Sequence, residues 1–125
     1  MTEPKFLLCK GCGKIVAVVQ DSACPTKCCG EAMEVLVPGT SDGAHEKHVP
    51  VYKVDGSKVD VVVGEVEHPM LEKHYIQWIA IQTKEGMQRK VLAPETAPKA
   101  SFMLTEGDEL IAVYEYCNLH GLWKA

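Results

Sequence analysis

The residues best suited to chemistry in this chain are its cysteines and histidines. Five of the six cysteines lie within the first thirty residues, and the sixth, Cys117, precedes His120 by three positions near the end. All five histidines lie beyond residue 44. Thiolate and imidazole groups are the usual protein ligands of zinc, iron and copper. The sequence therefore predicts metal chemistry, with one cluster rich in sulfur and another rich in nitrogen.

The N-terminal cysteines have the spacing of a metal site held by four thiolates. Cys9 and Cys12 form a C-x-x-C pattern, which lets two sulfurs from one tight turn reach the same ion. Gly13 follows and can adopt a positive φ, which turns backbone N–H groups toward sulfur. The remaining candidates lie in "CPTKCCG" and are Cys24, Cys28 and Cys29. Spacing alone leaves open which two of them complete a tetrahedral iron or zinc site, and a purely structural zinc knuckle is the alternative.

The histidines form the second group of candidates. Considered singly, a loop histidine is usually solvated, and a lone cysteine near a strand end is usually a small core residue. Four histidines, however, stand in predicted loops or at predicted strand ends, where side chains distant in sequence can converge: His48, His68, His74 and His120. Together with Cys117 they would make an imidazole-rich site with one thiolate. This ligand set suits iron, copper or nickel.

The hydrophobic pattern predicts an all-β chain in two parts. Apolar residues recur with a period of two in short segments such as "KVDVVVGEV" and "HYIQWIAIQT", and no sustained helical stripe separates them. The run at 37–50 is rich in Pro, Gly, Ser and Asp, which indicates a boundary. Residues 1–37 are too few to be stabilised by burial alone and are expected to need a metal or disulfides. Residues 38–125 carry about seven strand candidates at the spacing of a β-sandwich.

The composition of the chain limits its possible partners and its cellular location. The net charge of −4 argues against nucleic-acid binding, which requires a basic surface. No stretch approaches the roughly 20 apolar residues that cross a bilayer, and the N-terminus lacks the features of a secretory signal. We therefore expect a cytoplasmic protein without membrane partners. Thiols stay reduced in that compartment, so clustered cysteines favour metal binding over disulfides.

Several motifs closely resemble those of the desulfoferrodoxins, the two-iron superoxide reductases. They are "EKH" at 46–48, "HPMLEKHYIQWI" at 68–79 and "CNLHGLW" at 117–123, together with "CKGCG" and "CCG", and they extend over essentially the whole chain. The resemblance implies a small desulforedoxin- or rubredoxin-like iron module at 1–37, followed by an immunoglobulin-like β-sandwich at 38–125 that carries a second iron. The implied ligands of the first iron are Cys9, Cys12, Cys28 and Cys29, which leaves Cys24 as a non-ligand.

The same resemblance implies the second site and its activity. Its ligands would be four equatorial imidazoles and one axial sulfur, from His48, His68, His74, His120 and Cys117. The open ferrous site would reduce superoxide to hydrogen peroxide with electrons from a small external donor such as rubredoxin. Relatives of this kind are commonly homodimers, and the first iron would either relay electrons or be structural.

Two charged residues beside the second site acquire roles through the resemblance. Lys47 would attract superoxide and help to deliver protons, and Glu46 would occupy the open position after oxidation. Without the resemblance they would be an ordinary exposed charge pair. Lys73 would add to the local positive potential, whereas His45 matches no ligand position and is expected to be solvated.

Two other functions fit parts of the pattern. A non-catalytic electron-transfer protein would need a coordinatively closed second site, and binding of azide or cyanide to that site would argue against it. A zinc-stabilised binding module would hold one zinc ion per chain and would be colourless. Both differ from a superoxide reductase in metal content and in their response to superoxide.

Overall fold

The chain contains two compact units that are described separately. The structure is a computed structural model and describes residues 3–41 and 43–125. Contacts within the chain divide it into Met1–Val37 and Pro38–Ala125. Strands dominate both units, and the prediction of an all-β chain is confirmed. Within the described ranges, no helix has the length and hydropathy needed to span a membrane.

The N-terminal unit consists of short antiparallel strands around a very small core. β1 (Phe6–Leu8) lies between β2 (Ile15–Ala17) and β5 (Glu34–Val35), and β3 (Lys27–Cys28) pairs with β4 (Glu31–Ala32). The buried residues in the described part of this unit are Phe6, Leu7 and Cys9. So little buried apolar surface offers only slight stabilisation, which is typical of units held by metals or disulfides.

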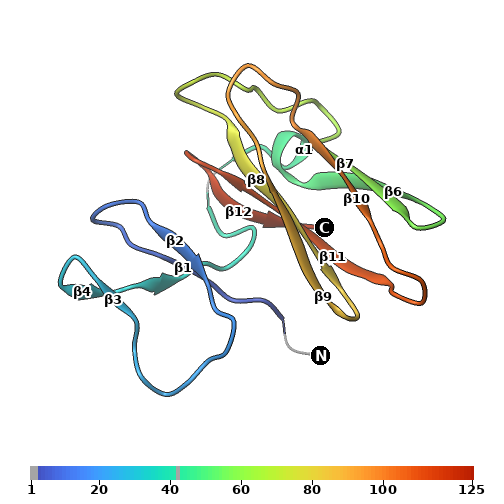
Figure 1. Cartoon of the computed structure of the whole chain (residues 1–125). Coiled ribbons are helices and arrows are strands. Elements are labelled where there is room, and N and C mark those ends of the chain that lie inside the picture. The colour runs from blue at the N-terminus through green and yellow to red at the C-terminus, as the bar shows by residue number, and fades with distance from the viewer. Residues whose placement is uncertain (1–2, 42) are drawn as a thin grey trace. The chain divides into compact units, whose positions relative to one another are not determined.

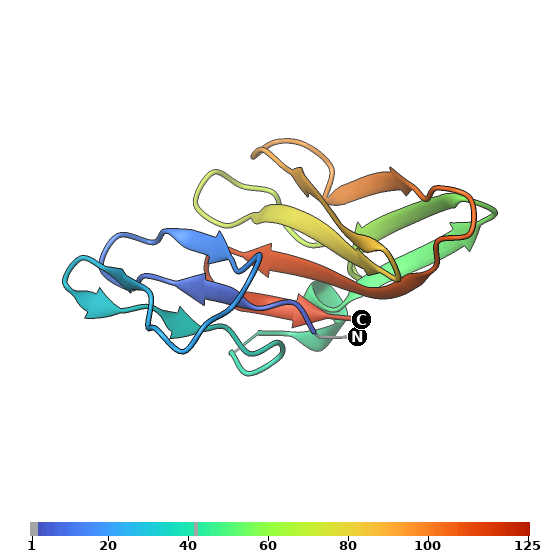
Figure 2. The same cartoon turned by 60° about the horizontal axis from the view of Figure 1, so that its bottom comes forward.

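The second unit is a β-sandwich of two antiparallel sheets (Figures 1 and 2). One sheet has the strand order β10-β7-β6, formed by β6 (Pro50–Asp55), β7 (Lys58–Val63) and β10 (Lys99–Met103). The other has the order β12-β11-β8-β9, formed by β8 (Ile76–Thr83), β9 (Gly86–Val91), β11 (Leu110–Cys117) and β12 (Gly121–Lys124). Sheets of three and four strands are typical of an immunoglobulin-like sandwich, as the sequence predicted.

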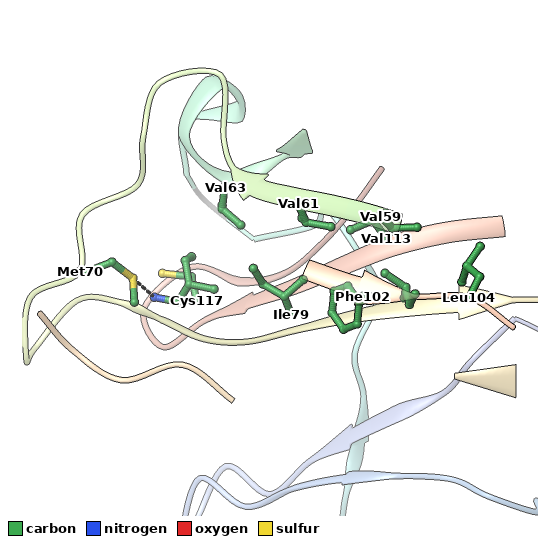
Figure 3. Packing of buried hydrophobic residues seen from close by; sticks show 11 residues of the cluster. Val59, Val61, Val63, Met70, Ile79, Phe102, Leu104, Val113 and Cys117 are labelled. Atoms are coloured by element: carbon green, nitrogen blue, oxygen red, sulfur yellow. Dashed lines mark hydrogen bonds between the residues drawn. The ribbon is translucent and has the colours of Figure 1, made fainter. Parts of the chain in front are cut away.

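The core lies between the two sheets because alternate residues of each strand point inward. On β7, Val59, Val61 and Val63 are at most 2% exposed, and the residues between them are less buried. Figure 3 shows these valines facing Ile79 and Val113 of the other sheet. The period-two pattern in the sequence therefore corresponds to this inward and outward alternation.

Strand register brings the predicted ligand loops to one end of the sandwich. Cys117, the last residue of β11, is paired with Ile76, the first residue of β8. Pro50, the first residue of β6, is likewise paired with Val63, the last residue of β7. The segments before β6, between β7 and β8, and after β11 therefore leave the sandwich at paired strand ends. The short helix α1 (His45–His48) lies in the first of these segments.

Candidate metal centres

Five side chains converge at this end of the sandwich, from the segment before β6, the connection between β7 and β8, and the end of β11 with the residues after it. One possible ligand atom from each lies within 4.8 Å of all the others, and the residues are His48, His68, His74, Cys117 and His120. His48 and His68 are each 2% exposed and Cys117 is completely buried, so the cluster is largely shielded from water. Imidazole nitrogens and one sulfur in this arrangement can hold a transition-metal ion.

The hydrogen bonds of two of the histidines indicate that their inner nitrogens are free to bind a cation. His48 Nδ1 lies 2.8 Å from the carbonyl oxygen of Ala44, and His68 Nδ1 lies 2.7 Å from that of Pro69. A carbonyl can only accept, so each Nδ1 donates its proton and each Nε2 carries a lone pair. Metal-bound histidines are commonly oriented by a backbone carbonyl in this way.

The distance between those two nitrogens provides a test of whether a metal fits. His48 Nε2 and His68 Nε2 lie only 3.1 Å apart, and with both Nδ1 atoms acting as donors neither Nε2 can donate to the other. Two lone pairs that face each other repel unless a cation lies between them. His48 Nε2 also lies 3.0 Å from His120 Nδ1. The site therefore fits a metal ion, which would turn this repulsion into coordination.

The protonation preferences of the histidines agree with metal binding. Burial lowers the pKa of His48 and His74, and it lowers that of His68 to about 4. The positive charge of Lys47 contributes to the lowering at His48 and His74, so its field reaches the cluster. His74 Nε2 is buried without a hydrogen-bond partner in the described residues. Neutral imidazoles with uncommitted nitrogens are the form that binds metals.

The thiol of Cys117 completes the cluster from the end of β11. Burial raises its pKa, and the backbone N–H groups of Leu119 and His120 oppose that effect by hydrogen bonding to the sulfur. Its Sγ lies 3.8 Å from His120 Nδ1. A bound cation would remove the thiol proton, and the two N–H groups would then stabilise the thiolate.

Helix α1 presents His48 together with two charged residues. The N–H of His48 donates to Ala44 oxygen at 3.1 Å, and the N–H of Val66 donates to Glu46 oxygen at 2.9 Å. Trp123 stacks on the His48 ring, with 5.1 Å between ring centroids. The helix is therefore fixed from both sides, although Glu46 and Lys47 themselves are exposed.

Glu46 and His45 lie outside the cluster. Glu46 and His45 line a surface cavity of about 600 Å³ together with Val49, Glu65 and the first residues of β6. His45 is exposed and meets Trp123 edge-on, with 5.2 Å between ring centroids. Neither side chain belongs to the group of converging ligand atoms.

The first cluster, formed by N-terminal cysteines, lies within the N-terminal unit, and the group of four histidines and Cys117 is the second cluster. The sulfurs of four cysteines lie within 4.8 Å of one another, and the residues are Cys9, Cys12, Cys28 and Cys29. All six cysteines of the chain are free thiols, and Cys24 is exposed and not part of this group. The arrangement has the ligand number and type of a tetrahedral thiolate site.

Backbone conformation explains how two adjacent cysteines serve one cluster. Adjacent residues in a strand point to opposite faces, but Cys29 has a φ of 53° and therefore leaves the extended conformation of β3. The pKa of Cys9 is lowered to about 7, mainly because the backbone N–H of Cys12 donates a hydrogen bond to its sulfur. The pKa of Cys28 is instead raised to about 12, mainly by its hydrogen bonds with the thiols of Cys9 and Cys12. These shifts show that the four thiols cannot all lose their protons easily while they lie so close together. A bound cation would stabilise the four thiolates.

Three residues near the second cluster did not emerge from the sequence as functional candidates. Trp123 stacks on His48, Asn118 forms hydrogen bonds beside His74, and Glu115 is completely buried on β11. Trp123 and Asn118 belong to "CNLHGLW", so the motif contained a signal for both. Glu115 shares the period-two phase of Val113 and Cys117, which would have placed it in the core.

Comparison with known proteins identifies the family. The family model described as Desulfoferrodoxin matches residues 40–125. The chain is 47% identical over 117 residues to a desulfoferrodoxin of Nitratidesulfovibrio vulgaris, covering 94% of this chain and 91% of the relative. It is 43% identical over 124 residues to a desulfoferrodoxin homolog of Methanothermobacter thermautotrophicus, covering 98% and 99%.

Solved structures agree with these sequence relationships. The crystal structure of the superoxide reductase from Treponema pallidum superposes with a TM-score of 0.84 at 38% identity, covering 99% of each chain. A one-iron superoxide reductase from Giardia intestinalis gives a TM-score of 0.56 at 38% identity, covering 64% of this chain and 95% of that one. The resemblance seen in the sequence motifs is thereby confirmed, and the chain belongs to the desulfoferrodoxin family.

Proposed function

We propose that this chain is a superoxide reductase that converts superoxide and one electron, with two protons, into hydrogen peroxide. The observation that carries the proposal is the convergence of four imidazoles and one thiol within 4.8 Å at one end of the sandwich. The match to the Treponema pallidum superoxide reductase over 99% of both chains supports it. An iron ion bound there would supply the electron and an open position for superoxide.

The proposed ligands are His48, His68, His74, His120 and Cys117. Because burial keeps the imidazoles neutral, the thiolate is the single negative charge among the five, and the loaded site stays cationic toward an anionic substrate. Trp123 covers one face of His48 and limits the access of water. The N–H groups of Leu119 and His120 moderate the electron donation of the sulfur.

Lys47 is proposed to guide superoxide and to provide protons. Its charge already affects the pKa of two of the proposed ligands, and the chain as a whole carries a net charge of −4. A local cation is therefore needed to attract an anion at a useful rate. Glu46, the preceding residue, is proposed to move from the surface cavity and occupy the open position once the site is oxidised.

A steering role for Lys47 can be measured directly. Lys47→Ile should lower the bimolecular rate constant for superoxide by about tenfold or more at low salt, and should flatten its salt dependence. Lys84→Ile is the matched control, because Lys84 follows the last residue of β8 at the opposite end of the sandwich. A Lys47→Ile chain that reacts like the wild type at every ionic strength would contradict the steering role.

The reaction itself is tested by metal analysis and stoichiometry. We expect two iron ions per chain, and rapid oxidation of the reduced second site by superoxide without release of dioxygen. Release of one dioxygen for every two superoxide ions would identify a dismutase instead. Cys117→Ser should abolish the sulfur-to-iron absorption and most of the activity, and an unchanged visible spectrum would contradict the assignment of Cys117.

The four-cysteine cluster is proposed to hold the first iron, as the entry point for electrons or as a structural element. Its ligands would be Cys9, Cys12, Cys28 and Cys29. The electrons would come from a small carrier protein such as rubredoxin, and the free thiols favour a cytoplasmic location. Cys12→Ser should remove one iron per chain. If electrons enter there, it should also slow re-reduction by the donor but not the reaction with superoxide.

We further propose that the chain forms a homodimer through β6. Tyr52 and Val54 are paired with the core residues Val61 and Val59, and so they lie on the core side of the sheet, yet each is 47% exposed. Within the part of the chain that the structure describes, β6 pairs only with β7, which leaves both its backbone edge and this apolar surface uncovered. A Tyr52→Lys chain should be monomeric by light scattering, whereas Met87→Lys, at the exposed edge strand β9, should remain dimeric.

A further inference from the structure

Asn118 connects the two loops that carry three of the proposed ligands. It directly follows Cys117, and its side chain reaches the residues on either side of His74. The amide oxygen accepts a hydrogen bond from the N–H of Tyr75 at 3.0 Å, and the amide nitrogen donates to the carbonyl oxygen of Lys73, also at 3.0 Å. Its own backbone N–H donates to the carbonyl oxygen of Tyr75 at 3.2 Å.

This pattern requires a carboxamide. One group must accept from an N–H and donate to a carbonyl at the same time, as a peptide group does, and among short side chains only asparagine has both functions in one plane. The loop before β8 is otherwise closed mainly on itself, by reciprocal backbone bonds between Leu71 and His74 at 2.9 and 3.0 Å. Those bonds shape the turn but do not attach it to the segment after β11.

The attachment acts on the backbone that carries His74. Backbone carbonyls orient the rings of His48 and His68, whereas His74 Nε2 has no hydrogen-bond partner in the described residues. The His74 ring meets those of His68 and His120 edge-on, with 4.7 and 5.0 Å between ring centroids, so its placement depends on these rings and on the backbone that carries it. Asn118 holds that backbone at Lys73 and Tyr75, immediately before and after the histidine.

We infer that Asn118 is a positioning residue that fixes His74 relative to Cys117 and so preorganises the second metal site. The inference rests on the proposed function, because it assumes that His74 and Cys117 bind the same ion. Groups that orient metal ligands typically change affinity by about 10–100-fold when they are removed. Loss of Asn118 should therefore weaken metal binding even though its side chain is not one of the converging ligands.

The test uses the full metal-free chain, with Zn²⁺ as the probe. Zn²⁺ is titrated against a competing chelator, and occupancy of the second site is followed by NMR on histidine ring nitrogens, which the four-cysteine cluster lacks. Amide hydrogen exchange at Tyr75 reports the bond to Asn118 independently of metal. Gln88→Ala is the matched control, since Gln88 Nε2 donates to Met103 oxygen at 2.9 Å on the sandwich surface, away from either cluster.

Asn118→Ala should weaken Zn²⁺ binding at the second site by about 10–100-fold and expose the Tyr75 amide to exchange. Binding at the four-cysteine cluster should stay unchanged, as should both sites in Gln88→Ala. Asn118→Asp keeps the acceptor for Tyr75 N–H but sets a carboxylate oxygen against the carbonyl oxygen of Lys73, where the two repel, so it should also weaken Zn²⁺ binding at the second site and provides a second variant should the alanine chain fail to fold.

In one outcome, Asn118→Ala exposes the Tyr75 amide to rapid exchange and still binds Zn²⁺ at the second site as tightly as the wild type does. This result would overturn the inference and leave Asn118 as a structural link only. Wild-type affinity in Asn118→Asp, with the alanine variant unfolded, would overturn it as well. Failure of the wild-type chain itself to shift the histidine resonances would instead contradict the proposed function. The two failures are therefore distinguishable.

Discussion

Replacing Gly64 with alanine should disturb His48 from a distance. A Cβ atom added at Gly64 would lie 2.8 Å from the carbonyl oxygen of Glu46 and 2.9 Å from that of Val49, whereas ordinary contact begins at 3.4 Å. The difference between 3.4 and 2.8 Å requires a shift of about 0.6 Å. Both oxygens belong to the backbone, so no change of rotamer can relieve the contact.

The required shift acts on the helix that presents the site. Glu46 lies within α1, and its carbonyl oxygen already accepts a hydrogen bond from Val66 N–H at 2.9 Å. A functional site generally tolerates displacements of about 0.5 Å. We therefore expect Gly64→Ala to weaken metal binding at the second site by about 10–100-fold. Overpacking should also lower the free energy of unfolding by roughly 1–3 kcal/mol.

The assay combines Zn²⁺ competition with thermal unfolding, and Gly107→Ala provides the control. Gly107 has a φ of +85° and nothing within 4 Å of an added Cβ, so alanine there should cost about 1–2 kcal/mol through its backbone conformation alone. If Gly64→Ala loses as much stability as Gly107→Ala but keeps wild-type metal affinity, the packing of α1 does not control His48. The argument from the close contact would then be wrong.

Three further predictions concern the metal-free chain. Burial raises the pKa of Glu115 from 4.5 to about 9, and its carboxylate has no hydrogen-bond partner among the described residues; its contribution to stability is full below pH 4.5 and is lost as the pH rises toward 9. Glu115→Gln should therefore raise the free energy of unfolding by about 3 kcal/mol at pH 7 and by little at pH 4, as measured by urea denaturation. The lowered pKa of His68 has the opposite effect on stability: its contribution is full above pH 6.5 and is lost as the pH falls to about 4. Between pH 6.5 and 4 the His68→Gln chain should therefore lose less stability than the wild type. Chelation should expose the amides of residues 3–37 to hydrogen exchange first, because only the second unit has a core of eleven buried residues; equal protection of the two units would contradict this order.

The sequence predicted the sandwich well because the period-two pattern records burial directly. Val59, Val61 and Val63 are apolar at every second position, and the structure buries all three. The same rule could have placed Glu115 in the core with Val113 and Cys117. It could not show that the carboxylate has no hydrogen-bond partner among the described residues, because that depends on which side chains surround it in the folded chain.

The two candidate clusters differ in how much of their geometry is local, and this explains how well each could be predicted. The four cysteines lie on two short turns, and the conformation of one residue, Cys29, decides that the adjacent pair can act together. Spacing therefore revealed the cluster but not its membership. For the second cluster, the predicted loops and strand ends grouped the four histidines with Cys117, and the family resemblance was needed to make them ligands of one ion.

The geometry of the second cluster could not be predicted from sequence spacing because strand pairing sets the positions of its side chains. Cys117 approaches the His74 loop because β11 ends opposite Ile76, with an irregularity in register at Tyr116 and Cys117. Shifting that register by one residue would turn the thiol away from the core. The sandwich thus acts as the ligand scaffold, whereas the first cluster depends mainly on its own turns. Substitutions in the core should consequently perturb the site of four imidazoles and one thiolate while leaving the four-thiolate site intact.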